Sequence, residues 1–202
     1  MTQSIQGMLT GVVKTVDSLK GYKTELPFAD GQLAVYEPLA ERMRTVRTGV
    51  DSTRTDWRVA AKGRTAGPQR AARELYRRVQ LELEAHYGQN SIRLDEFLHT
   101  SPNVSNTAAE WLDDLERLTG ALAANQEELP FAAGRLPEVE AAAAGLRAAM
   151  HDVNIKRAAK DEALAEWEAV KVEYRQARKV LRSKLAAHFG ARNHPRLKDF
   201  FD

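Results

Sequence analysis

The sequence predicts an all-α fold built from two similar helical halves, and three observations predict it. First, ELPFADGQL at residues 25–33 returns as ELPFAAGRL at residues 128–136, with seven of the nine letters identical. Second, further landmarks follow in the same order in both halves: LELEAHYG (81–88) and RLDEF (93–97), then RSKLAAHFG (182–190) and RLKDF (196–200). Third, apolar residues between the landmarks recur every three or four positions, which is the helical period. A repeated series of helical segments therefore organises the chain.

The repeat places one half at residues 1–98 and the other at residues 107–202, with a linker at residues 99–106. Each half runs from an amphipathic helix through a corner to a long helix, then to a His-aromatic-Gly motif and a short tail. Thr107 and Glu110 form a capping box that opens the first helix of the second half. We expect the two halves to pack as one structural unit.

The first helix and the corner that follows it are predicted from apolar spacing and from proline. Seven apolar residues share one face: Ile5, Met8, Leu9, Val12, Val13, Val16 and Leu19. The helix ends before Pro27, because the residue before a proline disfavours the α conformation. The LPFA-x-G motif then predicts the corner of a helical hairpin, because Gly31 can adopt a positive φ there. The same corner occurs twice, and its residues are Pro27, Phe28, Gly31, Pro130, Phe131 and Gly134.

The long helices carry heptad stripes. In half one the stripe comprises Tyr36, Leu39, Met43, Val46, Val50, Thr53, Trp57 and Ala60. We expect Pro38 near the first turn of this helix, where the missing N–H costs little. Residues 63–68 (GRTAGP) predict a break or kink before a third segment at residues 69–87. In half two nothing prevents one continuous helix from residue 137 to residue 189, although the polar segment 155–162 could bend it.

The lengths of these helices predict which segments pack together. A first helix of about 22 residues covers only about half of the long arm that follows it. The rest of each arm carries an apolar stripe that needs a partner, and the corresponding arm of the other half can provide it. We therefore expect an elongated, antiparallel helical bundle or coiled coil with pseudo-twofold symmetry, as if an ancestral homodimer had been fused.

His86 and His188 occupy equivalent positions, and each is followed by an aromatic residue and a glycine. The helix dipole favours histidine in the last turn, and Gly88 and Gly190 are suited to end the helices with a left-handed residue. A pair of metal ligands or acid–base groups is the alternative interpretation. The sequence has no HxxxH, Walker A, G-x-G-x-x-G or G-x-S-x-G pattern. We therefore predict no catalytic residue, no metal site and no cofactor.

Charge is distributed in blocks along the chain. Lys and Arg outnumber Asp and Glu by eleven to four in residues 41–79 and by twelve to five in residues 156–198. Acidic residues lead by twelve to three in residues 80–140. Two basic ridges result: Arg70, Arg73, Arg77 and Arg78 form one, and Arg175, Arg178, Lys179, Arg182 and Lys184 form the other. They can contact a polyanion, or the acidic middle segment of this chain or of a neighbouring molecule.

Composition narrows the class of protein. The 202-residue chain has 43% hydrophobic and 29% charged residues, which is ordinary for a folded protein. Because it lacks cysteine, it has no disulfide framework, thiolate metal site or thiol nucleophile. We expect no signal peptide, because the first 20 residues lack a basic segment followed by an apolar one, and no apolar run approaches about 18 residues. We expect a cytoplasmic protein without a membrane span, and the excess of Arg over Lys favours a bacterial source.

The LPFA-x-G corner and the His-aromatic-Gly…Leu-x-x-Phe ending resemble those of uncharacterised bacterial helical proteins that finish with Phe-Gly and a short tail. The resemblance implies no activity, cofactor or site. We predict a non-enzymatic helical scaffold or self-assembly module whose partner is another protein or a copy of itself. The alternative is a nucleic-acid-binding architectural protein that uses the basic ridges. No small-molecule substrate is predicted.

Overall fold

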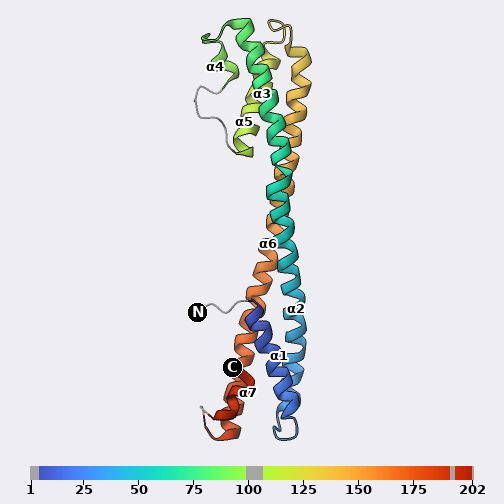
Figure 1. The fold of residues 1–202 in the computed structure, drawn as a ribbon, viewed down its shortest axis with the longest axis vertical. Coiled ribbons are helices and arrows are strands. Elements are labelled where there is room, and N and C mark those ends of the chain that lie inside the picture. The colour runs from blue at the N-terminus through green and yellow to red at the C-terminus, as the bar shows by residue number, and fades with distance from the viewer. Residues whose placement is uncertain (1–4, 99–106, 192–193, 202) are drawn as a thin grey trace. The chain divides into compact units, whose positions relative to one another are not determined.

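The computed structural model describes residues 5–98, 107–191 and 194–201, and every regular element in these ranges is helical (Figure 1). The elements are α1 (Ile5–Gly21), α2 (Ala29–Val59), the π-helix η1 (Ala60–Arg64), α3 (Ala66–Tyr87), α4 (Leu94–Phe97), α5 (Ala108–Ala124), α6 (Ala132–Phe189), the 3₁₀-helix η2 (Pro195–Leu197) and α7 (Lys198–Phe201). The predicted all-α class is confirmed. The linker predicted at residues 99–106 lies outside the described residues.

The chain forms two compact units, and each combines segments from both halves of the sequence. Unit 1 comprises Met1–Thr55 and Ala158–Asp202, and unit 2 comprises Asp56–Arg157. Unit 1 joins α1 and most of α2 to the C-terminal part of α6 and to α7. Unit 2 joins α3, α4 and α5 to the N-terminal part of α6. Each long arm therefore shares a core with the arm of the other half, as the unpaired apolar stripes predict.

The core of unit 1 lies between α1, α2, α6 and α7. Its buried residues include Met8, Val12, Leu19, Tyr36, Met43, Val50, Trp167, Tyr174, Leu181 and Phe200. The ring of Phe28 lies 6.0 Å from that of His188, and Arg42 forms an ion pair with Glu173 at 2.8 Å. Because the residue numbers rise along α2 as they fall along α6, the two helices are antiparallel.

The core of unit 2 lies between α3, α4, α5 and α6, and its main residues are Tyr76, Leu83, Phe97, Trp111, Leu115, Leu118, Leu122, Val139 and Leu146. The predicted capping box opens α5: the Glu110 N–H donates to the Thr107 hydroxyl at 3.2 Å, and the Thr107 N–H donates to the Glu110 carboxylate at 2.9 Å. These two bonds satisfy backbone donors that the first turn of a helix leaves free.

The two corners are built by matching backbone hydrogen bonds. The Ala29 N–H donates to the Leu26 carbonyl at 3.0 Å, and 103 positions later the Ala132 N–H donates to the Leu129 carbonyl at 3.0 Å. Leu26, Ala29, Leu129 and Ala132 are all buried. Pro27 and Pro130 lie in these turns, as predicted, and the helices α2 and α6 begin directly after Phe28 and Phe131.

The predicted role of glycine in the corner is wrong. Gly31 and Gly134 are the third residues of α2 and α6, and neither has a positive φ. The chain has already reversed before Ala29, because the turn at residues 22–28 closes with its own hydrogen bonds. A left-handed residue after that point would interrupt the first helical turn.

The break predicted at residues 63–68 is replaced by the π-helix η1 and by the start of α3, which contains Gly67 and Pro68. The flanking residues Val59 and Thr65 keep right-handed helical backbone angles. A π-helix closes its hydrogen bonds one residue later than an α-helix, so it accommodates an inserted residue. The first arm is one residue longer than the second and therefore needs a place for the extra residue. Its parts α2, η1, Thr65 and α3 hold 31, 5, 1 and 22 residues, whereas α6 holds 58.

The sequence predicted Pro38 near the first turn of its helix, but Pro38 lies inside α2. The helix begins earlier than the heptad stripe indicates, because the corner closes at Ala29. Pro38 cannot donate to the carbonyl of Ala34. Ala34 is exposed, so water can reach that carbonyl. In half two, α6 is one α-helix throughout, and its polar segment at residues 155–162 does not end it.

Candidate interaction surface

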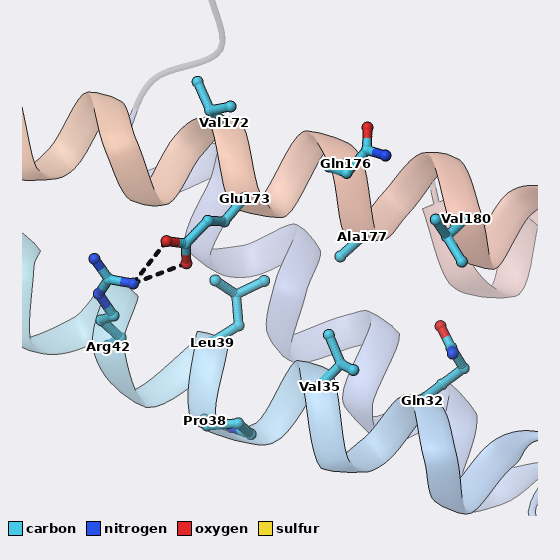
Figure 2. A pocket seen from close by; sticks show the side chains of 10 residues that line it. All are labelled: Gln32, Val35, Pro38, Leu39, Arg42, Val172, Glu173, Gln176, Ala177 and Val180. Atoms are coloured by element: carbon cyan, nitrogen blue, oxygen red, sulfur yellow. Dashed lines mark hydrogen bonds and ion pairs between the residues drawn. The ribbon is translucent and has the colours of Figure 1, made fainter.

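An apolar groove runs between α2 and the C-terminal part of α6 in unit 1 (Figure 2). It has a volume of about 650 Å³, and its lining residues are Gln32, Val35, Pro38, Leu39, Arg42, Val172, Glu173, Gln176, Ala177 and Val180. Three lining valines are exposed: Val35 at 46%, Val172 at 62% and Val180 at 40%. Such a set of exposed aliphatic side chains within one hollow is typical of an interaction surface.

Figure 2 shows how the helices place these side chains. Val35 points from α2 toward α6, and Val180 points from α6 toward α2. The Arg42 guanidinium donates to both Glu173 carboxylate oxygens at 2.8 Å, at one end of the groove. The charged groups that line the groove therefore neutralise each other, and the rest of its lining is neutral.

The corresponding positions in unit 2 carry charged side chains instead of valines. The arms begin at Ala29 and Ala132, so residues before η1 correspond to residues 103 positions later. The arms end at Tyr87 and Phe189, so residues after η1 correspond to residues 102 positions later. Val35 thus corresponds to Glu138, and Val180 corresponds to Arg78. Where unit 1 has two facing valines, unit 2 has an ion pair whose nearest atoms are 3.8 Å apart.

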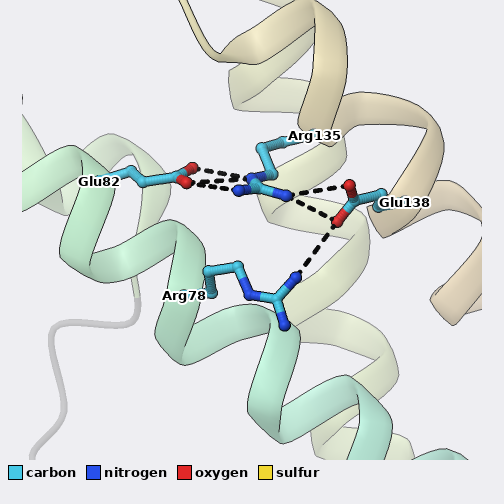
Figure 3. Close-up of polar contacts among 4 residues, drawn as sticks. All are labelled: Arg78, Glu82, Arg135 and Glu138. Carbon is cyan, nitrogen blue, oxygen red and sulfur yellow. Dashed lines mark hydrogen bonds and ion pairs between the residues drawn. The ribbon is translucent and has the colours of Figure 1, made fainter.

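We call this set in unit 2 the charged cluster, and it comprises Arg78, Glu82, Arg135 and Glu138 (Figure 3). The Arg135 guanidinium contacts Glu82 at 2.6 Å and Glu138 at 2.9 Å. The Arg135 and Glu82 side chains are only 23% and 28% exposed. The hydrogen bond to Glu82 raises the pKa of Arg135 most, and the bond to Glu138 raises it further. The guanidinium group therefore stays positively charged. Short bidentate contacts of this kind hold two helices in a defined register.

The predicted basic ridges divide into internal and free residues. Arg78 belongs to the charged cluster, and Arg178 donates to the Phe201 carbonyl at 3.0 Å with its guanidinium over the Phe201 ring. The Lys184 ammonium lies 5.9 Å from the centre of the Phe28 ring. The remaining arginines are exposed and have no ion-pair partner among the described residues: Arg70, Arg73 and Arg77 in unit 2, and Arg175 and Arg182 in unit 1.

Sequence reasoning missed the function of the repeated glutamate in ELPFA. Glu25 pairs with Arg196 at 2.7 Å in unit 1, and Glu128 pairs with Arg93 at 3.0 Å in unit 2. Each arginine opens an RL-x-x-F tail, and in each unit the tail comes from the other half of the sequence. The simultaneous return of ELPFA and RL-x-x-F at one spacing was the signal that could have indicated this contact.

The histidines lie where the cap interpretation puts them. His86 is in the last turn of α3 and His188 is in the last turn of α6, and both are exposed. Gly88 and Gly190 have φ of 88° and 73°, although the ψ of Gly88, 148°, differs from that of a left-handed helical residue. His86 belongs to unit 2 and His188 to unit 1. In the described part of the chain, no three His, Cys, Asp or Glu residues lie close enough to hold a metal ion.

Comparisons with known proteins give no relative for this chain. No family model matches it, and neither the curated proteins nor the solved structures contain a match. Within the described residues, no helix is both long enough and apolar enough to cross a membrane.

Proposed function

We propose that this chain is a non-enzymatic helical scaffold that acts through protein–protein contacts in the cytoplasm. One observation supports this function: unit 1 exposes an apolar groove at the position where unit 2 has an ion pair. Exposed valines cost solvation free energy, whereas the charged alternative is compatible with the same packing of two helices. A surface that keeps them is best explained by a partner that covers them.

We further propose that the chain arose by duplication and has pseudo-twofold symmetry. Matching helix starts, corner hydrogen bonds and Glu–Arg pairs support this origin. Each unit combines an ELPFA corner from one half with an RL-x-x-F tail from the other, as in a homodimer that exchanged segments before its subunits were fused.

A photo-reactive amino acid at position 172 tests the interaction function in the cells that produce the protein. Val172 lies in the groove, and Arg70 is its counterpart in unit 2, so position 70 is the matched control. We expect a defined adduct from position 172 and none from position 70. Mass spectrometry then identifies the adduct as a second copy or as another protein. Absence of any adduct at position 172 would contradict the proposed function.

Nucleic-acid binding is the second candidate function, and the free arginines of the basic ridges favour it. Arg70, Arg73 and Arg77 recur at helical spacing, and all three are exposed. Replacing these three by alanine should abolish a mobility shift of DNA or RNA, and wild-type binding should weaken steeply as salt rises. Unchanged binding in the triple variant would remove this ridge from consideration.

A further inference from the structure

We propose that the apolar groove of unit 1 binds one amphipathic helix of another protein, and that this helix carries acidic residues beside its apolar stripe. The inference rests on the proposed interaction function and specifies the partner. Three features of the molecule support it: the shape of the groove, the contrast with unit 2 and the charges beside the groove.

The shape of the groove fits a helix. The lining residues of α2 run from Gln32 to Arg42, a distance of about 15 Å along the helix axis, which matches about three helical turns. Two antiparallel helices leave a straight hollow between them, into which a third helix can place residues spaced i, i+3, i+4 and i+7. Val35, Leu39, Val172 and Val180 would contact such a stripe.

Unit 2 indicates that the groove does not follow inevitably from this arrangement of helices. There Glu138 and Arg78 occupy the positions of Val35 and Val180, and Arg70 occupies the position of Val172. The same helical framework is thus compatible with charged residues at each exposed valine position. The three valines are therefore available for binding rather than required for folding.

The charges beside the groove select an acidic partner. Nearby carboxylates are already neutralised within the chain: Glu173 pairs with Arg42, and Glu41 pairs with Arg44. Lys179 follows Gln176 by three residues on the same side of α6, is exposed and has no ion-pair partner among the described residues. Lys184 follows Val180 by four residues on α6, and its ammonium group lies over the ring of Phe28. Lys184 has no ion-pair partner among the residues that the structure describes. Two ammonium groups without carboxylate partners thus lie next to the groove.

A displayed library of 18-residue amphipathic helices tests the proposal on the full chain, with counter-selection against the double variant V35E/V180R. This variant introduces the Glu–Arg pair of unit 2, so it should fold while its groove is closed. V172R is the second variant, for the case that the first does not fold. It introduces an arginine, the residue that unit 2 has at the corresponding position 70, at one exposed position. We expect enriched peptides with Asp or Glu beside an apolar stripe, and at least about tenfold weaker binding to either variant.

Fluorescence anisotropy with an enriched peptide then tests the lysines. K179E/K184E should bind about five- to tenfold more weakly, with a loss that shrinks at high salt. R70E/R73E, which makes the same charge change in unit 2, should bind like the wild type. No enrichment, basic residues beside the stripe, or equal binding to K179E/K184E would overturn the proposal.

Sedimentation of the free protein separates this proposal from the broader function. A dimer that forms with rising concentration and is lost in V35E/V180R would identify a second copy as the occupant and overturn the acidic helix. Adducts at position 172 without enriched peptides would overturn only the proposed occupant. Absence of adducts at position 172 would overturn the interaction function itself.

Discussion

Unit 1 and unit 2 have the same corners and tails but fill the space between them differently. In unit 1, Gly11 leaves room for Tyr174: a Cβ on Gly11 would lie 2.8 Å from the Tyr174 hydroxyl oxygen. In unit 2 the corresponding residues are Asp114 and Ala72, both buried. Unit 1 thus has the large Tyr174 on α6 where unit 2 has the small Ala72 on α3. Unit 1 has Gly11 on α1 where unit 2 has the larger Asp114 on α5. The two units therefore fill this position of the core with different pairs of side chains.

Comparison of the two units identifies the residues that define the shared framework. The Glu–Arg contacts and the buried Leu and Phe of the tails occur in both units. The positions of Val35 and Val180 are apolar in one unit and charged in the other. The framework depends on the first group, and the second group is free to acquire a function.

Loss of a tail anchor should have the largest effect. Phe200 is fully buried in unit 1 and Phe97 is fully buried in unit 2. Either substitution by alanine should lower the free energy of unfolding of its own unit by about 3–5 kcal/mol. Urea titrations can follow the fluorescence of Trp167 for unit 1 and Trp111 for unit 2, with the other tryptophans replaced by phenylalanine. Equal losses from the two substitutions would support a common framework, whereas a loss in only one unit would refute it.

Gly11→Ala should destabilise unit 1 by about 1–3 kcal/mol, because the added methyl group collides with a buried tyrosine. Gly31→Ala is the matched control, since a Cβ there meets nothing, and it should stabilise α2 by up to about 1 kcal/mol. Tyr174→Phe removes the colliding oxygen and should restore most of the loss in a double-mutant cycle. If Tyr174→Phe gives no rescue, the Gly11–Tyr174 pair does not explain the glycine.

Arg135→Ala should lower the stability of unit 2 by about 1–2 kcal/mol, between the values typical of exposed and buried ion pairs. Arg42→Ala in unit 1 is the control, because its pair with Glu173 is about half exposed, and the loss there should stay below about 1 kcal/mol. Urea midpoints measured at low and at high salt provide the comparison. A larger loss from Arg42→Ala would reverse the assigned importance of the two ion pairs.

The smallest effect concerns alkaline pH and unit 1. Burial, and next the neighbouring Tyr174, raise the pKa of Tyr36 above its ordinary value of 10.0, and its hydroxyl has no hydrogen-bond partner among the described residues. The unfolded chain therefore releases this proton first, so stability is unaffected below about pH 10 and falls as pH rises further. Tyr36→Phe should reduce that fall by about 0.5–1 kcal/mol between pH 9 and pH 10.5. Parallel alkaline profiles for the variant and the wild type would contradict this.

Local sequence signals predicted the fold class, the capping box of Thr107, the turn prolines and the positive φ of Gly88 and Gly190. The capping box, the turn prolines and the two glycines could be predicted because each depends on residues within about one turn of the chain, whereas the fold class followed from the repeat and from helical periodicity. The groove and the charged cluster could not be predicted, because both depend on which residue of α6 faces which residue of α2 or α3. Apolar spacing identifies a buried face but does not identify the opposing side chain. Pro38 was misplaced for a related reason, since the corner determines where α2 begins.

The π-helix η1 has a consequence for how changes in chain length act on this molecule. Each residue added to an α-helix turns everything after it by about 100°. Without η1, the extra residue of the first arm would rotate Ala72, Val79 and Leu83 off their core. The wide turn of η1 absorbs that rotation within five residues, so these three residues of α3 face the core of unit 2. A single-residue deletion should therefore be tolerated within η1. The same deletion in the uninterrupted α6 would rotate the residues after it by about 100° and turn their apolar side chains away from the core.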